Sequence, residues 1–331
     1  MNFNAFVGID VSKSTIDVWI RNFGLHRVFP NSPDGFQAMI EWVMDCLGPM
    51  VHEQILFGLE HTGLYSELLI EFLDSNNLPF TVIPGLELKK SLGIRRGKSD
   101  RADSRDIAEY LYEKKEKIKL FEKPSRNLER IRKLSSYRER LVKERAAYKA
   151  RLGEHQAIFP AEELKVYFDS HKEVIACFDQ QIEKIQAEIK RLVREENELS
   201  RQYGLITSIK GIGPQTAIML IVLTKGFTAF QNSRKFASYS GIAPFPNQSG
   251  THMGKTRTSK LANRRIKSLL TMCAGVAIQY NTEMKIYYER RIQEGKNKMS
   301  TMNIIRNKLV ARAFAVIERG TDYVDTLKYA A

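Results

Sequence analysis

The sequence predicts an α/β domain followed by helical regions, a fold class of α/β plus α. Short β-rich runs alternate with amphipathic helical patterns from residue 4 to about residue 115. Long charged helical patterns begin near residue 125, and the chain beyond residue 202 is mostly helical. We therefore expect three regions, at residues 1–118, 119–200 and 201–331.

The first region contains five expected strands. They are residues 6–10, 15–20, 25–29, 54–59 and 79–83. The first three are close enough along the chain to form an antiparallel meander. Helices are expected at 33–47, from about 63 to 72, and from about 99 onward. A meander followed by strands that alternate with helices indicates a ribonuclease H-like sheet.

Two long helices are expected in the second region, joined near Phe159-Pro160. The second helix has apolar residues at spacings of three and four, which is typical of a coiled-coil seam. These residues are Ile175, Phe178, Ile182, Ile185, Ile189 and Leu192. The first helix is strongly basic, with Arg138 and Lys149 as candidate nucleic-acid contacts. A solvated helix face is the alternative interpretation.

The composition favours a polyanionic partner. The chain has 331 residues, with 52 Lys and Arg against 38 Asp and Glu, a formal charge of +14. Nucleic acid is the simplest such partner, although a merely soluble basic protein would have the same composition. The three cysteines lie far apart in apolar patterns and are expected to be reduced core residues. With no signal peptide or membrane span expected, we predict a cytoplasmic protein of bacterial type.

The third region contains a glycine-rich hairpin and an isolated serine. Residues 208–217 resemble a helix-hairpin-helix motif, in which the amides at Gly211 and Gly213 approach a DNA phosphate beside Lys210. A glycine turn between packed helices is the alternative. Residues 241–252 are expected to form a loop, in which Ser249 alone would be an ordinary turn serine. Candidate nucleic-acid contacts follow at Lys255, Arg257, Lys260, Arg264 and Arg265, and two amphipathic helices near 284–292 and 302–317 close the chain.

Four carboxylates are candidates for one metal site. Asp10 and Glu60 each end an expected strand, where open α/β sheets place their sites. Asp100 and Asp103 are three residues apart at the start of an expected helix, which puts them on one face. Alone, the helix pair is better explained by capping. Four converging acids repel each other unless cations neutralise them, and their oxygens suit Mg²⁺ or Mn²⁺.

These motifs resemble those of a known family. Residues 8–13 (GIDVSK), 60–63 (EHTG) and 98–103 (KSDRAD) look like the acidic motifs of DEDD transposases of the insertion sequence 110 family, related to the Piv DNA invertases. Residues 211–213 (GIG), 236–244 (FASYSGIAP) and 248–250 (QSG) resemble the second characteristic region of that family.

The resemblance implies a RuvC-like catalytic domain at 1–118, a coiled coil at 119–200 and a helical transposase domain at 201–331. It implies a magnesium-dependent DNA recombinase whose site joins Asp10, Glu60, Asp100 and Asp103 to the nucleophile Ser249. That site would combine different subunits of a dimer or tetramer acting on DNA of the bacterial nucleoid. An element-encoded guide RNA is also implied.

Three other functions fit parts of the pattern. A RuvC-like nuclease or junction resolvase would use the acids with water and leave Ser249 idle. An actin-like kinase or ATPase also has an acid-ended first strand, but the later glycine-rich nucleotide motifs are missing from the sequence. A non-catalytic scaffold would bind nucleic acid without needing the acids.

Overall fold

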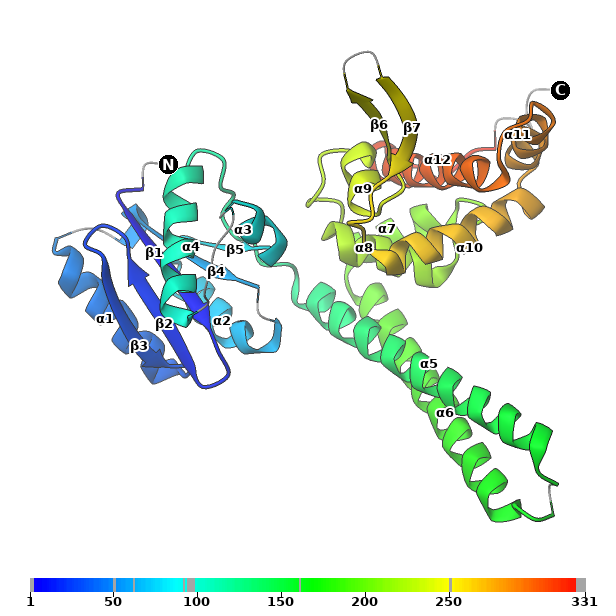
Figure 1. Cartoon of the computed structure of the whole chain (residues 1–331), viewed down its shortest axis with the longest axis horizontal. Coiled ribbons are helices and arrows are strands. Elements are labelled where there is room, and N and C mark those ends of the chain that lie inside the picture. The colour runs from blue at the N-terminus through cyan, green and yellow to red at the C-terminus, as the bar shows by residue number, and fades with distance from the viewer. Residues whose placement is uncertain are drawn as a thin grey trace. The chain divides into compact units, whose positions relative to one another are not determined.

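The computed structural model describes residues 3–49, 52–61, 63–91, 93, 99–160, 162–249 and 252–325. The chain forms two compact units, Met1–Lys123 and Pro124–Ala331. The first unit contains a mixed sheet with helices, and the second is mainly helical (Figure 1). No helix in the described ranges combines the length and apolarity needed to cross a bilayer.

A five-stranded mixed sheet organises the first unit. Its strands are β1 (Ala5–Val11), β2 (Thr15–Ile20), β3 (Leu25–Pro30), β4 (Ile55–Glu60) and β5 (Phe80–Ile83). The order across the sheet is β3-β2-β1-β4-β5. The first three strands form an antiparallel meander, while β4 is parallel to β1 and β5 is parallel to β4. All five expected strands and the meander are confirmed.

Helices cover both faces of this sheet (Figure 1). The helical elements are α1 (Pro33–Leu47), η1 (His52–Gln54), η2 (Gly63–Ser66), α2 (Glu67–Ser75), α3 (Gly85–Ser91) and α4 (Asp100–Lys114). Side chains of α1 and α2 pack with one set of alternating strand residues, which includes Val7 and Ile9. Side chains of α3 and α4 pack with the other set, which includes Phe6 and Leu56. The alternation arises because successive strand residues point to opposite faces.

Two glycines allow α4 to lie close against the sheet. Gly8 on β1 and Gly58 on β4 are directly paired. A Cβ atom at Gly8 would lie 2.1 Å from the Ser104 carbonyl oxygen and 2.4 Å from the Ala108 nitrogen. At Gly58 it would lie 2.7 Å from a methyl carbon of Leu111. Any larger residue would therefore push the helix away from the two central strands.

The second unit begins with two long helices, α5 (Arg126–Ile158) and α6 (Lys165–Glu195). They pack antiparallel, because pairs such as Arg130–Glu188 and Arg145–Asp179 join early residues of one helix to late residues of the other. The expected seam of α6 includes the buried residues Ile175, Ile182, Ile185, Ile189 and Leu192. Six further helices share a core with the base of this pair: α7 (Asn197–Thr207), α8 (Pro214–Thr224), α9 (Ser233–Tyr239), α10 (Arg264–Tyr280), α11 (Thr282–Gln293) and α12 (Lys298–Arg319). Helices α9 and α10 were not predicted.

The prediction of a loop at residues 241–252 is wrong. Strand β6 (Pro244–Ser249) pairs antiparallel with β7 (His252–Thr258), and the hairpin extends from the helices of its unit (Figure 1). Every residue of β6 is exposed. The sequence therefore lacks the apolar alternation that marks a half-buried strand. Pro246, which has no N–H to donate, lies where the register shifts between Phe245 and Asn247.

We expect Gly8→Ala to lower the free energy of unfolding of the first unit by about 1–3 kcal/mol, because the added methyl overlaps the α4 backbone. Both tryptophans of the chain, Trp19 and Trp42, belong to this unit. Urea unfolding followed by tryptophan fluorescence therefore reports on it selectively. Gly153→Ala, where a Cβ meets nothing within 4 Å, is the control and leaves that transition unchanged. An unchanged midpoint in Gly8→Ala would contradict the packing described.

Candidate functional site

Asp10 and Glu60 occupy equivalent positions on neighbouring parallel strands. Ile9 on β1 is paired with Leu59 on β4, so the next residue on each strand is one of the two acids. By alternation, both acids project from the face that carries Gly8 and Gly58, which is the face covered by α4. Their backbone positions are therefore about 5 Å apart, the spacing of adjacent strands.

Helix α4 contributes the next two acids from its first turn. The Ser99 hydroxyl accepts a hydrogen bond from the Ala102 nitrogen at 3.2 Å, so Ser99 is the N-cap and Asp100 is the first helical residue. Asp100 and Asp103 follow in the same turn. Their carboxylates also benefit from the helix dipole at this end. The N-cap is therefore Ser99 and neither of the two aspartates.

Three of the four predicted acids converge. Carboxylate oxygens of Asp10, Asp100 and Asp103 all lie within 4.8 Å of one another. Asp100 is exposed, while the other two are half-buried. Three carboxylates this close repel each other, and a divalent cation with oxygen ligands would neutralise them. The cluster is open to solvent on the Asp100 side, so a bound ion would also be accessible to a substrate.

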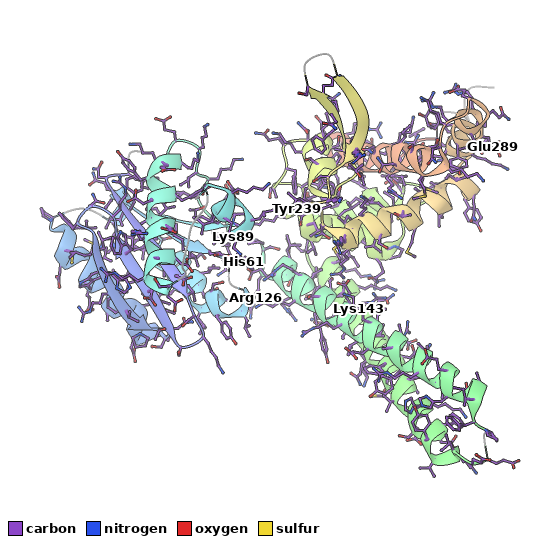
Figure 2. All side chains as sticks on the ribbon, viewed as in Figure 1. His61, Lys89, Arg126, Lys143, Tyr239 and Glu289 are labelled. Carbon is purple, nitrogen blue, oxygen red and sulfur yellow. The ribbon has the colours of Figure 1, made fainter. Side chains whose placement is uncertain are left out.

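Glu60 is outside this cluster. Its carboxylate lies against Gly85 at the start of α3, where a Cβ atom would come within 2.1 Å of Glu60 Oε1. The next residue, His61, donates its backbone N–H to the Ile83 carbonyl at 3.2 Å and is labelled in Figure 2. Glu60 therefore lies on the sheet face that α4 covers, one strand away from Asp10, and its side chain is directed toward α3. Thr62 and Lys98, which belong to the acidic motifs, lie outside the described residues.

A fifth acid, Asp17, was missed by the sequence analysis. It lies directly opposite Asp10 across the β1–β2 pair. Its side chain is buried, and its Oδ1 is 2.8 Å from Nε2 of His26 on β3. The available signal was a charged residue inside an expected strand that pairs with the Asp10 strand. Asp17 and His26 extend the polar line from the cluster across the antiparallel half of the sheet.

Ser249 is the last residue of β6 and is exposed. It pairs across the hairpin with His252, and the adjoining motif residue Gly250 lies outside the described residues. The two nearby serines have structural roles. The Ser240 hydroxyl is buried and donates to the Phe236 carbonyl at 2.8 Å. The Ser259 hydroxyl accepts from the Leu261 nitrogen at 3.1 Å and so stabilises a turn.

The glycine hairpin joins α7 to α8. Gly211 has a φ of +103°, and a Cβ atom there would lie 2.8 Å from Cβ of Ala277 on α10. This close packing against α10 is what the alternative interpretation, a glycine turn between packed helices, requires. Gly213 caps α8, and a Cβ there would meet nothing within 4 Å. Lys210 Nζ is 3.4 Å from a carboxylate oxygen of the buried Asp325, so this lysine has a partner inside the protein.

Several predicted nucleic-acid contacts are engaged with other protein groups. Arg265 forms an ion pair with Glu139 of α5 at 2.6 Å and donates to the Ser135 carbonyl at 3.1 Å. Arg138 donates to Gln186, and Lys149 Nζ lies 3.8 Å from Asp179. Burial is the main cause of a lowered pKa for both Arg138 and Arg265. The exposed members of the set are Arg257, Lys260 and Arg264, and the side chain of Lys255 is outside the described part of the chain.

Two transposase family models match this chain. Residues 7–160 match a DEDD-type model described as a transposase, and residues 203–289 match the transposase IS116/IS110/IS902 family. The pilin gene-inverting proteins of Moraxella bovis and Moraxella lacunata are each 27% identical over 335 residues, with 96% of this chain and 97% of theirs covered. An insertion element IS110 protein of 43.6 kDa from Streptomyces coelicolor is 28% identical over 119 residues, which cover 36% of this chain and 29% of that protein.

We expect Mn²⁺ to raise the melting temperature of the first unit and Asp103→Asn to remove most of that effect. A ligand at a hundred times its dissociation constant stabilises by about 2.7 kcal/mol. Thermal unfolding by tryptophan fluorescence measures the metal-induced shift, with Glu113→Gln on the exposed side of α4 as the control. Equal metal-induced shifts in all three proteins would exclude this site.

We expect Arg265→Gln to destabilise the second unit by about 1–2 kcal/mol, because it breaks a charged hydrogen bond to Glu139 that joins α10 to α5. The adjacent exposed residue provides the control, since Arg264→Gln removes the same charge without losing a described partner. Thermal unfolding followed by circular dichroism at 222 nm separates the two variants. Equal melting temperatures of the two variants would mean that the ion pair between Arg265 and Glu139 does not stabilise the second unit.

Proposed function

We propose that this chain, which belongs to the insertion sequence 110 family of transposases, is a DNA recombinase. In the proposed reaction, Ser249 attacks and cuts a DNA strand, and the strands are rejoined at a metal-binding acidic site. The observation that carries the proposal is the convergence of Asp10, Asp100 and Asp103 on one face of the sheet. Recombination also fits the pilin gene-inverting relatives, whose similarity extends along 96% of the chain.

The acids would hold a divalent cation at the scissile phosphate. Asp10, Asp100 and Asp103 would bind Mg²⁺ or Mn²⁺ through their carboxylate oxygens, and rotation of the Glu60 side chain away from Gly85 would add a fourth ligand. A bound divalent ion supplies charge neutralisation at the phosphate. The buried Asp17 beside Asp10 would restrict the orientation of the Asp10 carboxylate. The order of the strands, which is that of a ribonuclease H-like sheet, supports a RuvC-like nuclease site at residues 1–118.

Ser249 is the nucleophile in this proposal. Its Oγ forms a bond to phosphorus, the bond from phosphorus to one deoxyribose oxygen breaks, and that oxygen takes up a proton. The resulting phosphoserine link retains the energy of the phosphodiester, so a later attack by a DNA hydroxyl rejoins the strands without ATP. Exposure of Ser249 supports this role, and the hydrogen bonds of Ser240 and Ser259 argue against these two alternatives.

The family resemblance, rather than geometry, assigns the acids and the serine to one reaction. We propose that the active enzyme is a dimer or tetramer in which different subunits contribute them, with a coiled coil at residues 119–200 and the helical serine-bearing domain at 201–331. It would act on donor and target DNA in the bacterial cytoplasm, at the nucleoid.

A structured guide RNA is a further proposed partner. The exposed basic residues of α5 provide a surface for it, and two of them, Arg126 and Lys143, are labelled in Figure 2. The side chain of Lys143 is 73% exposed. The Gly213 amide and the exposed Arg257, Lys260 and Arg264 would contact nucleic acid from the helical domain. Sequencing the RNA that co-purifies with the protein identifies this partner.

We expect the wild-type protein to form a denaturant-resistant adduct with the DNA ends of its element in the presence of Mg²⁺ and the co-purifying RNA. Ser249→Ala should abolish the adduct, whereas Ser259→Ala should retain it. Asp10→Asn should reduce adduct formation by at least 10²-fold, because it weakens the binding of the cation that would neutralise charge on the phosphate in the transition state. Electrophoresis of labelled DNA under denaturing conditions provides the measurement.

Two outcomes contradict this mechanism. An adduct that persists in Ser249→Ala would exclude this serine as the nucleophile. Cleavage by the wild type without any adduct would instead identify a hydrolytic nuclease that uses water at the acids.

A further inference from the structure

A polar pocket lies in the first unit, beside the edge strand β5. Its volume is ≈ 520 Å³, and residues of β5, α3, the end of α4 and the segment that follows α4 line it. Figure 1 shows the positions of these helices and of β5. Its polar side chains include Glu87, Ser91, Tyr110, Lys114, Lys117 and Lys119. It is distinct from the acidic cluster, with which it shares no lining residue.

The walls of this pocket are fixed by hydrogen bonds. The buried Tyr110 of α4 donates its hydroxyl to Glu87 Oε1 of α3 at 2.6 Å. The chain turns after α4, where the Lys117 nitrogen donates to the Lys114 carbonyl at 2.7 Å. It then returns to the free edge of β5, where the Phe121 nitrogen donates to the Phe80 carbonyl at 2.7 Å. This turn places three lysines around one opening.

The charge of the pocket is positive. Lys114, Lys117 and Lys119 are exposed, and no ion pair is found for them within the described part of the chain. Elsewhere in the same unit, Lys123 is paired with Glu71 and Asp74. The one carboxylate in the pocket, Glu87, already accepts the Tyr110 hydrogen bond. Glu113 and Glu116 are the acids on the flanking segment, and both are exposed. Three ammonium groups, each with three donors, suit a phosphate group.

The three lysines lie at the opposite end of α4 from the acidic cluster. Asp100 is the first residue of α4 and Lys114 is its last, so about 21 Å along the helix axis separates them. Between these ends, the pocket follows β5 as far as Ile83, which is paired with Glu60. Successive phosphates of one DNA strand rise by about 3.4 Å along the helix axis. A strand that is bound at the acids and runs along α4 would therefore reach the lysines with a phosphate about six nucleotides away.

We propose that this pocket binds a backbone phosphate of the DNA strand that passes the acidic cluster. The contact is to charge and not to base edges, so it anchors DNA independently of sequence. The location of the strand rests on the proposed function, but the binding itself does not require cleavage.

The test compares full-length variants by fluorescence anisotropy, with labelled single-stranded DNA in EDTA over a range of salt concentrations. The triple variant Lys114→Gln/Lys117→Gln/Lys119→Gln should bind about tenfold or more weakly at low salt. Its slope of log K against log [salt] should fall by about 0.7, because that is the contribution of one phosphate contact to a single-strand slope. The control Lys165→Gln/Lys184→Gln/Lys190→Gln removes three exposed charges from α6 and should retain the wild-type slope. Tryptophan fluorescence verifies that the first unit of each variant is folded.

The remaining measurements separate the possible sources of the phosphate and the two proposals. Inorganic phosphate up to millimolar concentration should compete weakly with DNA, whereas strong competition would identify a site for the free anion and overturn the proposal. Equal losses of DNA affinity in the pocket variant and the α6 control would also overturn it. So would a loss of affinity that is seen only with RNA of the same sequence. The adduct assay tests the serine mechanism and the salt dependence of binding in EDTA tests the pocket, so failure of the one and failure of the other give different results.

Discussion

The approach of α4 to β1 and β4 is the constraint on which the first unit depends. Two paired glycines remove the side chains that would separate this helix from the sheet, and the first turn of α4 thereby reaches the end of β1. Carboxylates that are ninety residues apart in the sequence then come within 4.8 Å. The same helix carries Tyr110 and Lys114 in its last turns, so its placement also forms the basic pocket. One packing contact therefore fixes two sites of opposite charge.

The sheet and the acidic cluster were predictable from sequence to different degrees. The strands, the meander and the spacing of Asp100 and Asp103 follow from local patterns, and each is present. The direction of the Glu60 side chain was not predictable, because it depends on the space left by Gly85 on another element. Asp17 was overlooked because the pattern of a strand does not show which residue of the neighbouring strand lies opposite, and so did not place Asp17 beside Asp10. The β6–β7 hairpin escaped prediction because exposed strands lack an apolar pattern. The roles assigned to the acids and to Ser249 stay predictions.

Some basic side chains of the second unit have partners inside the protein, and others are exposed. Arg265 and Arg138 have internal partners and are partly desolvated, and Lys210 is paired with a buried carboxylate. Arg257, Lys260 and Arg264 are exposed, although the sequence presents all six residues alike. Composition cannot make this distinction, since it depends on acids and carbonyls brought close by folding. A formal charge of +14 therefore overstates the charge that is available to nucleic acid.

The exposed hairpin of β6 and β7 has a consequence for local stability. A two-stranded ribbon gains little from the hydrophobic effect when one of its strands, here β6, is exposed at every residue, so it opens at a lower free-energy cost than the helices that support it. Under the proposed function, the nucleophile Ser249 stands on this ribbon, so its direction depends on whether the ribbon is closed. Ordering of the ribbon would then draw on the energy of DNA binding and would coincide with capture of the substrate. Under the proposed function, this coupling discourages strand cleavage before a complete complex has assembled.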